Sequence, residues 1–168
     1  MRENDGHQFG RLPETDEDRE VEGRPSREAV VDFWHDRYGI PRETWADYTF
    51  WERGSGKIWA FRGEVPSPVR IEGLGMAVLR TDHDHWKPTT NAAQRFGRLA
   101  TDCVIDLSPE EAEAFVAGHD QELPEWDGDW GYLVAAHELA GEREPIGVGL
   151  YLHGELRSQI PKGRRREL

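Results

Sequence analysis

The sequence predicts an α+β fold built around a small mixed or barrel-like β-sheet with a few short helices. Glycine-containing turns separate short runs of aromatic and β-branched residues, which is typical of hairpins. The helical stretches are short and begin at good capping residues. Strands do not alternate regularly with helices of about ten residues or more, so a parallel α/β arrangement is disfavoured.

The first 25 residues are polar and charged, with little to bury, and we predict a disordered acidic tail over residues 1–25. A helix is predicted from Ser26 to Tyr38. Ser26 is a favourable N-cap, and Gly39 followed by Pro41 ends the helix.

A β-hairpin is predicted next, because aromatic-rich segments 48–53 and 57–62 flank the turn Gly54-Ser55-Gly56. Residues 69–79 are predicted to form a further strand, interrupted by glycines. Residues 26–86 therefore form one small α+β segment in this interpretation.

A helix is expected between Lys87 and Ala100, where Pro88 and two threonines suit a first turn. Its apolar side chains fall on one stripe, and we predict that this stripe joins the two halves of the chain. The opposite side carries Arg95 and Arg98, so this helix presents positive charge in an acidic protein.

The remaining chain predicts several strands and one helix. Ser108-Pro109-Glu110-Glu111 is a capping box with proline at the first helical position, and this helix should end at Gly118. Strands are predicted at residues 101–107, 131–139, 146–152 and 156–160. Glycines at 147 and 149 alternate with apolar residues, which allows close approach of another backbone segment.

The formal charge is −12, from 33 acidic and 21 basic residues. Residues 100–150 hold 13 acidic residues and one basic residue, so the acidic excess is concentrated there. Acid excess combined with scarce lysine indicates adaptation to high salt. The basic isoelectric point that is usual for nucleic-acid binders is absent, yet only the local field at a site acts on a phosphate.

No catalytic or cofactor site is expected. A phosphate-binding glycine loop is absent, so we predict no nucleotide cofactor. Cys103 is the only cysteine, which excludes an intrachain disulfide and favours a reducing cytoplasm, and we expect a packed, inert thiol. His83 and His85 could converge on a metal ion, but no third ligand is evident nearby, so we expect a polar loop. No apolar run of about 18 residues could span a membrane.

Basic side chains gather at the end of the chain and on the central helix. They are the candidate phosphate contacts: Lys87, Arg95, Arg98, Arg157, Lys162, Arg164, Arg165 and Arg166. Taken alone, either group would be explained by a solvated surface. Their presence together in an acidic chain favours nucleic-acid binding.

Several ordered motifs add a family resemblance. Lys87-Pro-Thr-Thr-Asn-Ala92, Ser108 to Gly118 and Ile160-Pro-Lys-Gly-Arg-Arg165 resemble the RNA-binding PUA-like C-terminal region of Sun/Nop-type RNA cytosine-5 methyltransferases, the RsmF group. Phe33 to Ile40 and Lys57-Ile-Trp59 resemble the segment that precedes PUA in that family.

The resemblance covers residues 26–168 and implies a pre-PUA segment at 26–86 followed by a PUA-like RNA-binding domain at 87–168. The composition suggests a halophilic archaeon as the source. The methyltransferase domain of the family has no counterpart, since neither its glycine-rich cofactor loop nor its pair of catalytic cysteines is present. The resemblance therefore implies a non-catalytic module.

Two functions follow as hypotheses. The first is a non-catalytic cytoplasmic protein that binds structured ribosomal or transfer RNA, in ribosome biogenesis or RNA modification. The second is an adaptor that uses the acidic stretch from Thr101 to Leu150 to dock a basic partner, such as a ribosomal protein or a separate RNA methyltransferase.

Overall fold

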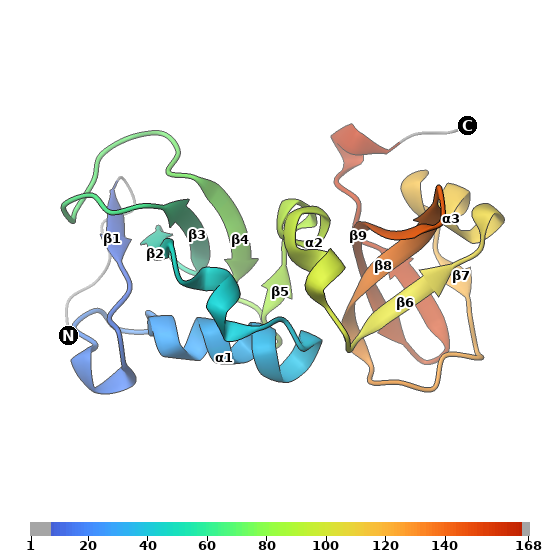
Figure 1. The fold of residues 1–168 in the computed structure, drawn as a ribbon, viewed down its shortest axis with the longest axis horizontal. Helices are drawn as coiled ribbons and strands as arrows, with labels where there is room; N and C mark the ends of the chain where they lie inside the picture. Colours follow the sequence, from blue (N-terminus) through green and yellow to red (C-terminus); the bar gives the residue numbers. More distant parts are fainter. Residues whose placement is uncertain (1–7, 166–168) are drawn as a thin grey trace. The chain divides into compact units, whose positions relative to one another are not determined.

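The computed structural model describes residues 8–165, and the chain divides into two compact units, Met1–Lys87 and Pro88–Leu168 (Figure 1). Each unit is built on a five-stranded β-sheet. Helices are few and short, so the α+β class predicted from the sequence is confirmed. Within residues 8–165, no helix is both long enough and apolar enough to cross a bilayer.

The first sheet has the strand order β1-β2-β3-β4-β5. Its strands are β1 (Phe9–Arg11), β2 (Tyr48–Arg53), β3 (Lys57–Arg62), β4 (Met76–Arg80) and β5 (Lys87–Pro88). The hairpin of β2 and β3 has the bounds that the sequence predicts, and Trp51 pairs with Trp59 across it. Aromatic cross-strand pairs of this kind stabilise a twisted antiparallel ladder.

The first helix, α1 (Arg27–Tyr38), also agrees with its prediction. Ser26 Oγ accepts a hydrogen bond from the Ala29 N–H at 3.0 Å, and Gly39 closes the helix at φ 70°. The buried ring of Trp34 packs against that of Trp45, with ring centroids 5.8 Å apart. Trp45 ends the short 3-10 helix η2 (Arg42–Trp45).

The predicted disordered tail is wrong for residues 8–25. β1 pairs with β2, and Phe9 is fully buried in a cluster with Trp51 and Leu74. Arg24 is buried as well, and another 3-10 turn, η1 (Asp16–Asp18), lies between them. The ordered structure of this segment could not be predicted from its polar composition, because its few apolar side chains are buried by residues that lie far away in sequence.

The strand predicted at residues 69–79 is limited to β4, which starts at Met76. Gly75 precedes it at φ +70°, and a Cβ there would collide with the carbonyl oxygen of Ala60. The backbone turns at this glycine, so the upstream residues do not continue the strand. Val69 instead forms an isolated bridge with Phe9.

The second sheet has the order β6-β8-β9-β10-β7 and curls into a half-barrel. Its strands are β6 (Val104–Leu107), β7 (Gln121–Glu122), β8 (Gly131–Leu139), β9 (Glu142–Leu152) and β10 (Glu155–Ser158). β6 runs parallel to β8, whereas the other pairs are antiparallel. β6 and β7 are therefore the two edges of this sheet.

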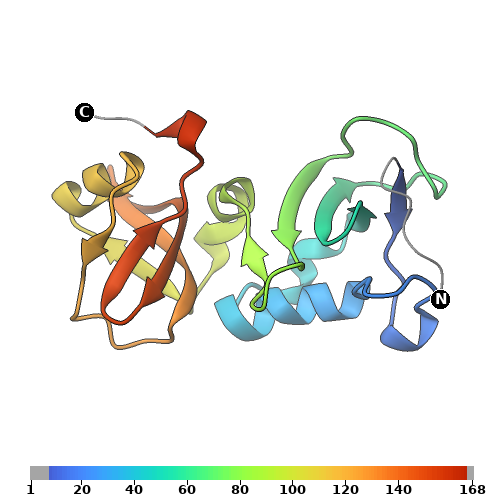
Figure 2. The same cartoon turned by 180° about the vertical axis from the view of Figure 1, so that it is seen from behind.

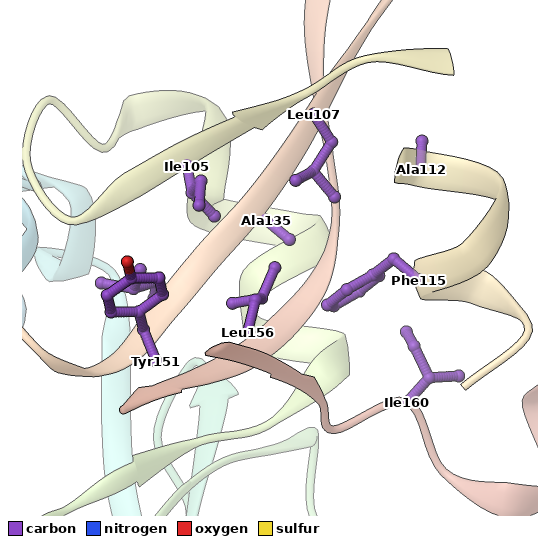
Figure 3. Packing of buried hydrophobic residues seen from close by; sticks show 9 residues of the cluster. Ile105, Leu107, Ala112, Phe115, Ala135, Tyr151, Leu156 and Ile160 are labelled. Atoms are coloured by element: carbon purple, nitrogen blue, oxygen red, sulfur yellow. The ribbon is translucent and has the colours of Figure 1, made fainter. Parts of the chain in front are cut away.

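The core of the second unit is centred on Phe115, which α3 (Pro109–Val116) inserts into the concave side of the sheet (Figure 3). The predicted capping box of α3 is present, with Ser108 and Glu111 bonding to each other's backbone N–H groups. Ile105, Ala135 and Leu156 come from three different strands and belong to the same buried cluster as Phe115 (Figure 3). Packing of these side chains in one core stabilises the curvature of the sheet.

Two glycines of β9 make room for this core. A Cβ at Gly147 would lie 2.6 Å from Ile160 Cδ1, and one at Gly149 would lie 2.5 Å from Leu156 Cδ1. The alternating glycines predicted close approach of another backbone segment, but the atoms nearest to these two positions belong to the side chains of Ile160, Leu156 and Phe115. The next turn, at His153 and Gly154, has φ values of 52° and 80°, as two-residue hairpin turns require.

The helix α2 (Thr90–Phe96) covers the opposite face of this sheet, where it packs on β9. Thr89 Oγ1 caps it by accepting from the Ala92 N–H at 3.0 Å. Lys87 and Pro88 belong to β5 and not to the helix, contrary to the sequence expectation. The buried side chains on its apolar face are Thr90, Ala92, Ala93 and Phe96. This stripe thus packs on a sheet of its own unit, where it has a structural role.

Candidate nucleic-acid interface

Two basic elements that are distant in sequence meet in the second unit. The 3-10 turn η4 (Lys162–Arg164) lies beside the start of α2, and Arg164 Nη2 donates a hydrogen bond to Asn91 Oδ1 at 2.7 Å. Figures 1 and 2 show this turn, in red, next to α2 in yellow-green. Asn91 and Arg95 are one helical turn apart on the same side of α2.

The C-terminal segment is held in place by the core beneath it. Ile160 is buried, and its carbonyl oxygen accepts a hydrogen bond from Arg165 Nε at 3.1 Å. The side chain of Arg165 lies directly over Gly118, where a Cβ would collide with it. Gly118 has φ +89°, so the residue that ends α3 also leaves the space that this arginine fills.

We use the name α2–η4 surface for polar side chains of α2 and of the segment that holds η4: Asn91, Arg95, Lys162, Arg164 and Arg165. All of its members are exposed. Arg95, Lys162 and Arg164 form no ion pair with any residue in 8–165. The hydrogen bond of Arg164 goes to a neutral amide, so the charge of its guanidinium is not cancelled. The surface therefore combines uncompensated cations with planar donors that suit phosphate oxygens.

Two other predicted contacts have carboxylate partners. Arg98 Nη2 lies 2.5 and 2.7 Å from the two carboxylate oxygens of Glu144. The hydrogen bond with Glu144 raises the pKa of Arg98 further above its usual value. Arg157 Nε donates to Glu155 Oε1 at 2.7 Å. Since each charge is balanced locally, these two arginines have less positive potential to offer a phosphate than the α2–η4 surface.

Lys87 belongs to the first unit, whereas the other candidates belong to the second. It is partly buried, and desolvation lowers its pKa, with a smaller contribution from the positive charge of Arg80. Arg166 lies outside the described residues. Of the predicted set, Arg95, Lys162, Arg164 and Arg165 thus belong to the α2–η4 surface, whereas Lys87, Arg98 and Arg157 lie in other environments.

Asn91 was missed from the sequence, because a neutral side chain among basic ones carries no charge signal. Its spacing of four residues before Arg95 is the one indication that the sequence contains. The contact with Arg164 spans 73 residues and depends on the sheet that supports both elements.

The side chains that could ligate a metal ion do not cluster in the part of the chain that the structure describes. Among residues 8–165, no three His, Cys, Asp or Glu side chains come together in a way that could hold a metal ion. His83 lies 3.8 Å from Asp82, in a bend before β5. Cys103 precedes β6 at φ 53°, packs beside the core and lies 4.0 Å from Asp129 Oδ2.

Comparison with known proteins gives two matches. Residues 1–75 match a family described as a family of unknown function (DUF7122). The chain is also 23% identical over 109 residues to ribosomal RNA small subunit methyltransferase F from Aeromonas salmonicida (strain A449). This second match covers 63% of the chain and 22% of that protein, so the chain spans about a fifth of its length. It is a partial similarity to the Sun/RsmF group of RNA methyltransferases.

Proposed function

We propose that this protein binds structured RNA through the α2–η4 surface and does not itself modify the RNA. The observation that carries the proposal is the hydrogen bond between Arg164 and Asn91, which joins two basic elements into one exposed surface. Guanidinium groups bind phosphate oxygens through paired N–H donors. Three uncompensated cations at this place suit the backbone of a folded RNA.

The partial similarity to a ribosomal RNA methyltransferase supports ribosomal RNA as the ligand, with transfer RNA as the alternative target. We propose that the second unit is a PUA-like domain, an assignment that its half-barrel and helix arrangement suits. The first unit is then the segment that precedes such a domain. A role in ribosome biogenesis or RNA modification, in the cytoplasm of a halophilic cell, agrees with these assignments.

The test measures RNA binding by fluorescence anisotropy, with labelled helical fragments of small-subunit ribosomal RNA and a transfer RNA as probes. The test variant is R95A/K162A/R164A. The matched control is R42A/R62A/R70A, which removes the same charge from exposed positions of the first unit. Loss of about 1 kcal/mol per phosphate contact predicts binding weaker by about 100-fold for the test variant.

Salt dependence separates a phosphate contact from a general charge effect. The slope of log affinity against log salt should fall by about 2 to 3 in the test variant and remain near the wild-type value in the control. Equal loss in both variants would reject the α2–η4 surface as the site. Retention of full affinity by the test variant, at low and at molar salt, would do the same.

A further inference from the structure

The second unit has an open groove on the concave side of its sheet, between the edge strands β6 and β7. The groove has a volume of about 460 Å³. β6 lines it with Val104, Ile105 and Asp106, and the segment from Glu122 to Trp126 lines it from the side of β7. Glu111 of α3 contributes the remaining side chain. The groove therefore occupies the place where a closed barrel would have another strand.

The backbone of both edges has hydrogen-bonding groups directed toward this opening. Val134 N–H donates to Cys103 O at 2.9 Å, so Cys103 and Ile105 bond to β8 while Val104 and Asp106 direct their N–H and C=O groups outward. On β7, Leu123 N–H donates to Gly154 O at 2.9 Å, which turns the backbone of Glu122 away from β10. Such groups are ready to pair with an added strand.

The side chains that line the groove determine which kind of added strand could bind there. Its floor is apolar, with Ile105, Leu123 and Trp126 partly or fully buried. Its polar side chains are all acidic: Asp106, Glu111, Glu122 and Glu125. Asp106 is paired with Arg143, at 2.6 and 2.7 Å, whereas Glu122 and Glu125 have no cationic partner among residues 8–165. The groove therefore repels a phosphate backbone and attracts a basic chain.

We propose that this groove binds an extended, basic segment of a protein partner by strand addition to β6. The segment alternates apolar residues, which face Trp126 and Leu123, with lysine or arginine residues that pair with Glu122 and Glu125. Main-chain hydrogen bonds to Val104 and Asp106 supply affinity, and the carboxylates supply selectivity. This function uses a different set of residues from the α2–η4 surface, so it does not depend on RNA binding.

The experiment uses the full chain and a labelled peptide, Val-Arg-Val-Arg-Val-Arg-Val, as the probe. Hydrogen exchange measured by NMR should slow for the amides of Val104 and Asp106 when the peptide is added. The amide of Ile105 already bonds to β8 and should change little, which provides an internal control. A peptide with the same side chains but N-methylated on every residue should bind at least tenfold more weakly, because it cannot donate backbone hydrogen bonds.

The charge contribution is tested with E122Q/E125Q against the control E113Q/E138Q, which neutralises two exposed acids outside the groove. Loss of two surface charge pairs predicts peptide affinity lower by about tenfold in the first variant only. The proposal is overturned if both variants bind the peptide equally, or if the amides of Val104 and Asp106 stay unprotected. It is also overturned if a ribosomal RNA fragment protects the same amides, because the groove would then belong to RNA.

Discussion

Replacement of Arg24 by methionine tests whether residues 8–25 are part of the fold. Arg24 Nε donates to Glu52 Oε1 at 3.1 Å, and the two side chains are 8% and 5% exposed. The other oxygen of Glu52 accepts from the Gly56 N–H at 3.0 Å. The pair therefore connects this N-terminal segment to the β2–β3 hairpin and its turn.

The expected cost follows from this geometry. At 3.1 Å and an effective dielectric constant of about 20, the attraction within the pair is about 5 kcal/mol before desolvation. Removal of one member leaves a buried charge without its partner, which costs about 3 to 5 kcal/mol of unfolding free energy. R24M should lose stability in this range. The double variant R24M/E52Q should be more stable than R24M, because it no longer buries the unpaired carboxylate.

The assay is denaturant unfolding followed by tryptophan fluorescence. Five of the seven tryptophans belong to the first unit, so the signal reports mainly on this unit. R62M is the control, since Arg62 is 69% exposed and lies 3.8 Å from Asp47, and it should change stability by less than about 0.5 kcal/mol. An R24M variant as stable as R62M would refute this reasoning and would favour the prediction that this N-terminal segment is disordered.

Three further predictions concern both units. F115A removes a fully buried ring from the second core and should cost about 3 to 5 kcal/mol in thermal or denaturant unfolding. S108A removes the cap at Glu111 and should cost about 1 kcal/mol in the same assay. The hydrogen bond from Arg80 holds the pKa of Asp82 below its usual value of 3.8. The stabilisation from this pair is thus present above about pH 3.8 and is lost as the pH falls through the lowered pKa. In R80Q, an NMR titration should show the pKa of Asp82 higher than in the wild type, and an unchanged value would contradict the assignment.

Local signals were sufficient for most elements. The capping residues Ser26 and Ser108, the turn at Gly54 and the alternation along β9 each predicted an element that the structure contains. These features act within a few residues of one another, through backbone hydrogen bonds and allowed dihedral angles, so they can be recognised in the sequence. The α+β class followed from them.

Long-range contacts account for the elements that the sequence did not predict. β1 forms because Phe9 is buried against Trp51 and Leu74, and nothing in the polar segment around it indicates that burial. The short edge strands β5 and β7 likewise depend on partners elsewhere in the chain. Among the basic residues, composition could not distinguish Arg98, which is paired with Glu144, from Arg95, which forms no ion pair with a described residue.

The sequence by itself determined the fold class, the main hairpins and helix ends, and the set of basic side chains from which a site could be built. The tertiary structure decided that η4 and α2, two elements that carry members of this set, lie side by side, through the hydrogen bond of Arg164 to Asn91 across 73 residues. It also decided that acidic residues face a groove with two open strand edges. The physical reason is that charge and capping are properties of a residue and its near neighbours, whereas a surface is defined by segments that only the folded sheet brings together.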